Sequence, residues 1–183
     1  MHKTFQARRL DVAAFAQAQG LLEGRDLLSD YERLALDSSA PAADLTVTWR
    51  ARGETRQAAD GSARPALHLL ADAALPLICQ RCMEPMLAPV HVDAHFVFMP
   101  DESSAAALDD QSEDDLLALT SALDLHALIE DELLLAQPLV PRHAQCPRAV
   151  RLSAQDADFD AAGQGKASPF AALAALGRGG KPG

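Results

Sequence analysis

The chain has 183 residues, of which 49% are hydrophobic and 23% are charged, and this suits one globular domain with tails better than two full cores. Aromatic residues make up only 4%, and the formal net charge is −10. Both figures argue against a basic, base-stacking platform for DNA or single-stranded nucleic acid.

The negative charge is concentrated in one segment. Residues 1–82 carry ten Lys/Arg and ten Asp/Glu, residues 83–141 carry thirteen Asp/Glu and no Lys/Arg, and residues 142–183 carry six Lys/Arg and three Asp/Glu. An acidic block is typical of a solvated face or loop, and a site for a basic protein partner is the alternative.

Three cysteines do not make an even disulfide framework, and the N-terminal residues lack the apolar stretch of a secretory signal. No run approaches the roughly 18 apolar residues of a membrane span. We therefore expect a cytoplasmic protein that has no membrane contact.

The first third of the chain is expected to form short helices. Asp11 is suited to cap a segment that ends near Gly20, and Ser29 with Glu32 has the spacing of a capping box. Helices this short are marginal alone in water, so they must pack on a larger element.

Three strands are expected next, because apolar residues fall on alternate positions over 45–52, 67–79 and 90–98. Pro76 indicates a bulge or an edge position in the second strand. Short connections between successive strands are typical of an antiparallel meander.

Residues 101–115 are rich in Asp, Glu, Ser and Ala and are expected to form an acidic surface loop, with 116–120 as a candidate fourth strand. Asp124 is a suitable N-cap for a following helix, which Pro138 would end. The apolar face of this helix would consist of Leu125, Leu128, Ile129 and Leu133. Its other face carries Glu130, Asp131 and Glu132, for which a solvated surface, a polar network and a partner-binding surface are the alternatives.

The sequence thus predicts an α+β fold, an antiparallel β-sheet packed with short helices, in a single domain over residues 1–152. Residues 153–183 are expected to be a flexible tail. Within it, Ser168, Pro169 and Gly177 delimit a short helical motif over 168–177. Its apolar residues, which would dock on the chain's own domain or on a partner, are Phe170, Leu173 and Leu176.

The strongest candidate for chemistry is a pair of half-sites, Cys79-Gln80-Arg81-Cys82 and His143-Ala144-Gln145-Cys146. Three thiols and one imidazole are ligands that zinc takes in a closed tetrahedral site, and each two-residue spacer lets both members face one ion. A redox-active C-x-x-C pair and plain cysteines in a turn are the alternatives.

Two polar faces are weaker candidates. His91, Asp93 and His95 recur on one side of the third strand and could hold a metal, although an exposed polar face is the simpler interpretation. Arg50, Arg52 and Arg56 lie on the polar side of the first strand and are candidate RNA contacts or an ordinary solvent face. The sequence contains no phosphate-binding glycine loop, nucleophile elbow or H-E-x-x-H motif, so it supplies no argument for an enzyme.

Taken together, residues 20–177 resemble the bacterial YceD family, the large ribosomal RNA subunit accumulation proteins. The resemblance rests on Leu77-Ile78-Cys79-Gln80-Arg81-Cys82 with Pro85, on Asp124-Leu125 and Ile129–Ala136, on Pro138, Pro141, His143 and Cys146, and on Ser168–Leu176. Some relatives have a more Cys-rich second half-site, where this chain has His143 and Cys146.

The resemblance implies a non-enzymatic cytoplasmic factor for the synthesis, processing or stability of 23S rRNA, and so for large-subunit assembly. We expect it to act mainly through contacts with ribosomal proteins or assembly factors of the large subunit, with 23S rRNA contacted directly or indirectly. The alternatives are a metal-dependent hydrolase that uses His91, Asp93 and His95, and a C-x-x-C redox protein.

Overall fold

The computed structural model describes residues 4–39, 44–57, 61–109, 112 and 114–148. The chain divides into two units, 1–148 and 149–183. The second unit lies outside the described residues. So do the expected tail over 153–183, its motif over 168–177, and Phe170, Leu173 and Leu176.

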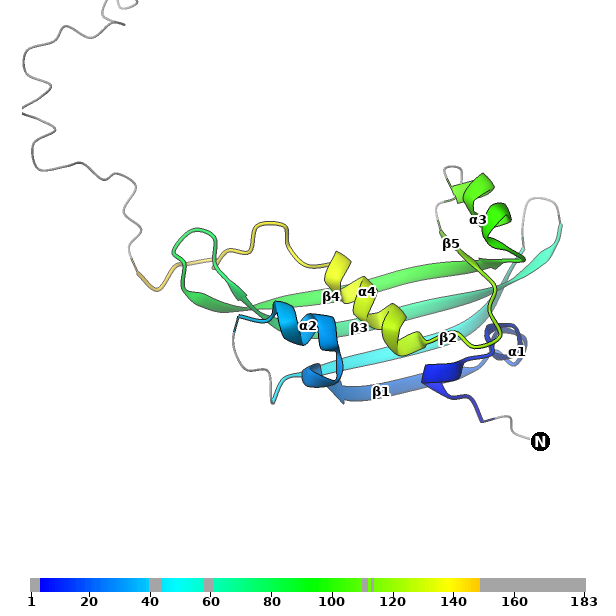
Figure 1. Cartoon of the computed structure of the whole chain (residues 1–183), viewed down its shortest axis with the longest axis horizontal. Coiled ribbons are helices and arrows are strands. Elements are labelled where there is room, and N and C mark those ends of the chain that lie inside the picture. Colours follow the sequence, from blue (N-terminus) through cyan, green and yellow to red (C-terminus); the bar gives the residue numbers. More distant parts are fainter. Residues whose placement is uncertain (1–3, 40–43, 58–60, 110–111, 113, 149–183) are drawn as a thin grey trace, which may run out of the picture. The chain divides into compact units, whose positions relative to one another are not determined.

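The first unit is built on a five-stranded sheet in which spatial order follows chain order (Figure 1). The strands are β1 (Leu21–Leu27), β2 (Thr46–Gln57), β3 (Ala63–Ile78), β4 (Pro85–Met99) and β5 (Asp115–Ala118). The first four pair antiparallel, whereas β5 pairs parallel with the end of β4. The α+β fold with an antiparallel meander is therefore confirmed, with one parallel strand added.

Short helices occupy the connections. They are the 3-10 turns η1 (Ala7–Arg9) and η2 (Leu28–Asp30) and the helices α1 (Val12–Gln17), α2 (Glu32–Asp37), α3 (Glu102–Leu108) and α4 (Leu125–Leu135). Asp11 and Asp124 cap α1 and α4 as predicted, since their carboxylates accept from Ala14 N–H and from His126 and Ala127 N–H. None of the helices in the described part is long and apolar enough to cross a membrane.

The core lies between one face of the sheet and the helices, with α4 lying across β3 and β4 (Figure 1). The strands contribute alternate residues to this face because a strand's side chains point to opposite sides. Buried members include Val47, Leu67, Leu69, Leu75, Val90, Val92 and Phe96 from the strands and Phe15, Leu34, Leu125, Ile129 and Leu133 from the helices. The other face carries most of the sheet's charged side chains.

Three local predictions were wrong. Residues 21–27 form the edge strand β1 rather than helix, and its side chains are no more than half-buried. Ser29 lies inside η2, and Tyr31, not Ser29, precedes α2 without a capping side chain. The segment 101–115 is not simply a loop, because Asp101 accepts from Ser104 N–H and starts helix α3.

Pro76 lies at an edge position of the sheet, because at this point β3 has a neighbouring strand on one side only. The pairing of β2 with β3 ends at Val47 and Ala73, so Pro76 pairs only with Leu87 of β4. Its missing N–H therefore costs no ladder hydrogen bond to β2, and Pro76 O instead accepts from Ser39 N–H.

Candidate metal centre

The first half-site is the turn between β3 and β4. Met83 N–H donates to Cys79 O at 2.8 Å and Cys79 N–H donates to Glu84 O at 3.0 Å. Met83 takes a left-handed backbone conformation with φ of 59°, which lets the chain reverse within a few residues. Cys79 and Cys82 therefore stand on one tight turn at the end of the longest hairpin.

The second half-site reaches this turn through the segment that follows α4. Gln80 N–H donates to Pro141 O at 2.8 Å, and Arg148 forms an exposed ion pair with Glu84 at 3.1 Å. These contacts hold residues 141–148 against the hairpin. The two half-sites are about 60 residues apart in sequence, and these two contacts bring them together without involving the cysteine sulfur atoms.

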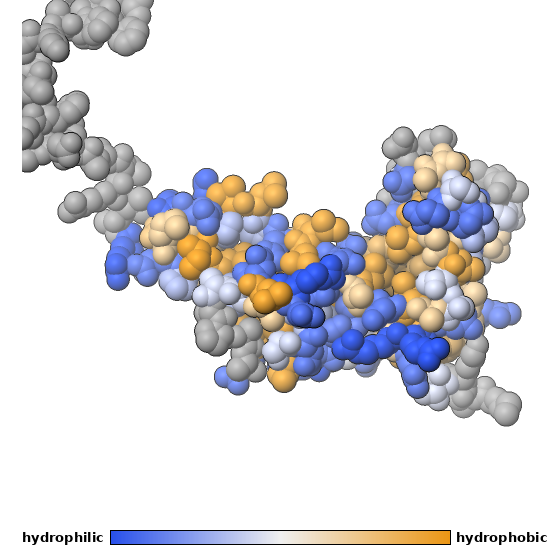
Figure 2. Space-filling model, in the orientation of Figure 1, coloured by the Kyte–Doolittle hydropathy of each residue, from blue (hydrophilic) through white to orange (hydrophobic). Residues whose placement is uncertain are grey.

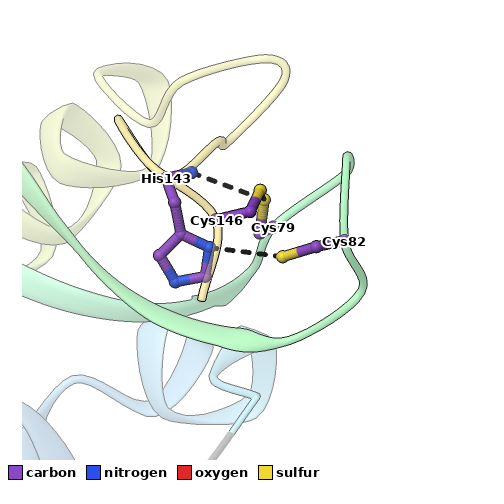
Figure 3. A group of neighbouring side chains, drawn as sticks. All are labelled: Cys79, Cys82, His143 and Cys146. Atoms are coloured by element: carbon purple, nitrogen blue, oxygen red, sulfur yellow. Dashed lines mark hydrogen bonds between the residues drawn. The ribbon is translucent and has the colours of Figure 1, made fainter. Parts of the chain in front are cut away.

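The four predicted residues meet in one cluster (Figure 3). The sulfur atoms of Cys79 and Cys146 are 4.0 Å apart, Cys82 Sγ is 3.4 Å from His143 Nδ1, and all four ligand atoms lie within 4.8 Å of one another. In a tetrahedral site with a Zn–S distance of about 2.3 Å, two sulfurs are separated by about 3.8 Å. The spacing therefore suits one metal ion with small side-chain adjustments.

Hydrogen bonds around the cluster distinguish the two hairpin thiols. Burial raises the pKa of Cys79, but backbone N–H donors, including that of His143 at 3.4 Å from Sγ, outweigh this and bring the pKa below its usual range. Burial and neighbouring thiols raise the pKa of Cys82 instead. The surroundings of Cys79 thus favour its thiolate, whereas a metal ion bound to Cys82 would have to displace the proton of that thiol.

Arg81 is part of the centre although it was not among the predicted ligands. Its Nε donates to Cys146 Sγ at 3.1 Å, and its terminal nitrogen donates to His143 O at 2.8 Å. Interaction with Cys146 raises the pKa of Arg81. Its place inside the C-x-x-C loop was the available signal, since a loop residue between two ligands must lie near the metal.

Residues 67–177 match the family described as "Large ribosomal RNA subunit accumulation protein YceD". The chain belongs to the YceD family. No curated protein and no solved structure matches it significantly.

The YceD match contains both half-sites, together with most of β3 and all of β4 and α4, which bring them together. It begins at Leu67 and so excludes β1 and β2. The family description connects such chains with accumulation of large-subunit ribosomal RNA.

The three arginines that were candidate RNA contacts lie on the outer face of β2, outside the YceD match. Arg50 pairs with Glu23 at 3.3 Å, and Arg56 lies 3.8 Å from Asp114 and 3.2 Å from His95 Nδ1. Two of the three positive charges therefore already face groups of the same chain.

Of the candidate group His91, Asp93 and His95, only Asp93 and His95 lie close together. His91 Nδ1 lies 2.8 Å from Asp72 Oδ1 and is separate, whereas His68 of β3 joins Asp93 and His95. The histidine across the strand pair was missed because register determines it, and a single strand's pattern does not give the register.

The acidic triad of α4 has divided roles. Glu130 is only 7% exposed and accepts from the backbone N–H groups of Arg33 and Leu34, so it forms the polar network that was one of the three alternatives. Asp131 pairs with the Arg33 side chain and is half-exposed. Burial, followed by repulsion from Asp115 and Asp131, raises the pKa of Glu132. Asp131 and Glu132 remain accessible to a partner, although Asp131 already pairs with Arg33.

Proposed function

We propose that this YceD-family chain is a non-enzymatic cytoplasmic factor that supports synthesis, processing or stability of 23S rRNA and thereby assembly of the large ribosomal subunit. The observation that carries the proposal is that the family match spans both half-sites and the elements that bring them together. We infer that the function shared by the family uses the part of the fold that holds this cluster.

We assign zinc to the cluster as a structural ion held by Cys79, Cys82, His143 and Cys146. Three thiolates and one imidazole complete a tetrahedral shell and leave no coordination position for a substrate, which is the difference between structural and catalytic zinc sites. The donor set is also softer than the oxygen-rich sites that magnesium and calcium need. Zinc in this position would fix the segment after α4 to the β3–β4 hairpin.

That segment contributes to an exposed surface that fits a protein partner. The α4-end surface consists of Asp131, Glu132, Leu135, Leu139 and Val140. Leu135 is 79% exposed and Leu139 fully exposed, and apolar side chains gather over the end of α4 and the following segment (Figure 2). Exposed apolar groups beside carboxylates are typical of interaction sites.

The charge of the α4-end surface favours a basic protein over RNA. Burial raises the pKa of Glu132, and repulsion from the nearby carboxylates of Asp115 and Asp131 raises it further. A lysine or arginine from a partner would relieve this repulsion, whereas a phosphate would add to it. Basic ribosomal proteins or basic assembly factors of the large subunit would be partners of the required charge, and contact with 23S rRNA would then be indirect.

The proposal is tested by deleting the gene in the source organism and resolving ribosomes on a sucrose gradient. We expect a reduced large-subunit peak and a reduced amount of 23S rRNA relative to 16S rRNA, both restored by the wild-type gene. Normal amounts of both would overturn the proposed function.

Complementation with variants tests the surface. Leu135→Ser with Leu139→Ser should fail to restore the peak. The matched control is Leu36→Ser, which changes a residue on α2 that is 80% exposed and should restore it. Equal rescue by the double leucine variant and by Leu36→Ser would exclude the α4-end surface. Failure of a triple variant, Arg50→Gln with Arg52→Gln and Arg56→Gln, to restore the peak would point instead to direct RNA contact.

A further inference from the structure

The outer face of the sheet carries a second group of metal-ligand side chains, on the two strands that lead into and out of the cysteine turn. His68 of β3 and His95 of β4 are direct partners in the antiparallel register, and Asp93 lies two residues from His95 on the same face of β4. The two imidazoles stack with ring centroids 4.0 Å apart and an interplanar angle of 11°. Paired strands therefore fix the positions of both histidines.

The three ligand atoms are close enough for one ion. His68 Nε2 and Asp93 Oδ1 are 2.7 Å apart, and no two of the three ligand atoms are more than 4.8 Å apart. With metal–ligand distances of about 2.0 Å, tetrahedral ligands are separated by about 3.3 Å. A cation could replace the hydrogen that His68 and Asp93 share, and small rotations of the side chains would bring His95 into its shell.

We propose that His68, Asp93 and His95 form a second metal site, which binds a divalent transition ion such as Zn²⁺, Ni²⁺ or Cu²⁺. Two imidazoles and one carboxylate suit these ions better than Mg²⁺ or Ca²⁺, which prefer oxygen ligands alone. The His68 side chain is 25% exposed and that of Asp93 is 56% exposed, so the ion would be reached directly from solvent. Three protein ligands leave at least one position for water.

Neighbouring groups allow this arrangement. Arg56 Nη2 lies 3.2 Å from His95 Nδ1 and 3.8 Å from Asp114 Oδ1. When a metal ion binds His95, the Arg56 side chain can therefore pair with Asp114 instead. His91 lies on the same face of β4 but pairs with Asp72, and it is not a member of the group. This separation supplies a matched control, since His91 differs from His95 in partners and not in residue type or strand face.

The site is independent of the proposed function and of the cysteine cluster. The test uses the tag-free full chain, first loaded with one equivalent of Zn²⁺ and then titrated with Ni²⁺ by isothermal titration calorimetry. We expect one further equivalent to bind the wild type. His68→Gln and His95→Gln should each weaken Ni²⁺ binding by about tenfold or more, whereas His91→Gln should change it by less than about twofold.

The outcomes separate this site from nonspecific binding. Equal losses in all three variants would show adventitious binding to surface histidines and would overturn the proposal. No loss in His68→Gln or His95→Gln, or no Ni²⁺ binding by the wild type, would also overturn it. Circular dichroism checks that each variant is folded, and all three substitutions are on the solvent-facing side of the sheet, so the comparison does not depend on a core change.

Discussion

Glu130 of α4 caps helix α2 at a residue 97 positions away, since its Oε1 accepts from Arg33 N–H at 2.7 Å. The same oxygen accepts from Leu34 N–H at 3.2 Å. A short helix that lacks a capping residue of its own thus obtains one from another element. This contact connects the N-terminal part of the chain, which lies outside the family match, to the YceD part.

Replacement of Glu130 by Gln is expected to lower the free energy of unfolding by about 2 kcal/mol, because charge-assisted hydrogen bonds to buried N–H groups are weakened. Urea unfolding followed by circular dichroism measures the change. Asp131→Asn is the control, since Asp131 is half-exposed and should contribute no more than about 0.5 kcal/mol. Equal effects of the two substitutions would contradict the capping role.

The environment of Tyr31, the chain's only tyrosine, should make the folded protein less stable at alkaline pH. Burial, followed by the hydrogen bond to Asp26 at 2.9 Å, raises its pKa well above the ordinary value of 10.0. Above pH 10 the unfolded chain therefore loses a proton that the folded chain keeps, and the free energy of unfolding should fall by up to about 1.4 kcal/mol per pH unit.

The alkaline effect is measured by urea unfolding between pH 9 and 11 in wild type and Tyr31→Phe. The wild type should show a steeper decline above pH 10 than the variant. Tyrosinate absorbance should appear in the wild type only as the protein unfolds. Parallel pH profiles, or tyrosinate in the folded protein near pH 10, would contradict the prediction.

Much of the fold was predictable because its signals are local. Alternation in β3 and β4 and the aspartate caps of α1 and α4 depend on residues close in sequence. In contrast, β1 is an edge strand that pairs only with β2, and its positions alternate between exposed and half-buried. Its sequence therefore lacks the alternation of apolar and polar residues that predicts a strand. β5 runs parallel to β4 because α3 connects the two strands. The hydrophobic pattern of β5 alone does not show this direction.

The cysteine cluster was predictable for the same reason, because two short motifs carry it and the fold had only to bring them together. The remaining site residues depend on long-range register. His68 joins Asp93 only because β3 and β4 pair at His68 and His95, and Glu130 meets Arg33 only because α4 packs beside α2. Neither contact has a signature within one segment.

Arg81 is expected to strengthen metal retention, since its guanidinium donates to Cys146 Sγ and offsets the negative charge of three thiolates. Arg81→Gln should weaken Zn²⁺ binding by about tenfold or more in competition with a chromophoric chelator. The matched control is Arg148→Gln, which removes an arginine with a 79% exposed side chain that pairs only with Glu84 among the described residues. A similar loss in both variants would mean that general charge, and not the contact to sulfur, determines retention.

Metal removal should destabilise the chain locally as well as globally. With a strong chelator, the melting temperature should fall by an amount equivalent to about 3 kcal/mol or more, as expected for loss of a tightly bound ligand. Hydrogen exchange at Gln80, whose N–H donates to Pro141 O, should become faster. The chelator should not affect the Cys79→Ser, Cys82→Ser variant, and an equal effect on that variant would show that the chelator acts elsewhere.

We propose above that the chain serves large-subunit assembly through protein contacts. The most direct test of this proposal is the composition of material that co-purifies with the tagged full chain from its source organism, with and without ribonuclease treatment. We expect ribosomal proteins or assembly factors of the large subunit that stay bound after the RNA is digested. Loss of all of them on digestion, or the absence of large-subunit components from both samples, would contradict it.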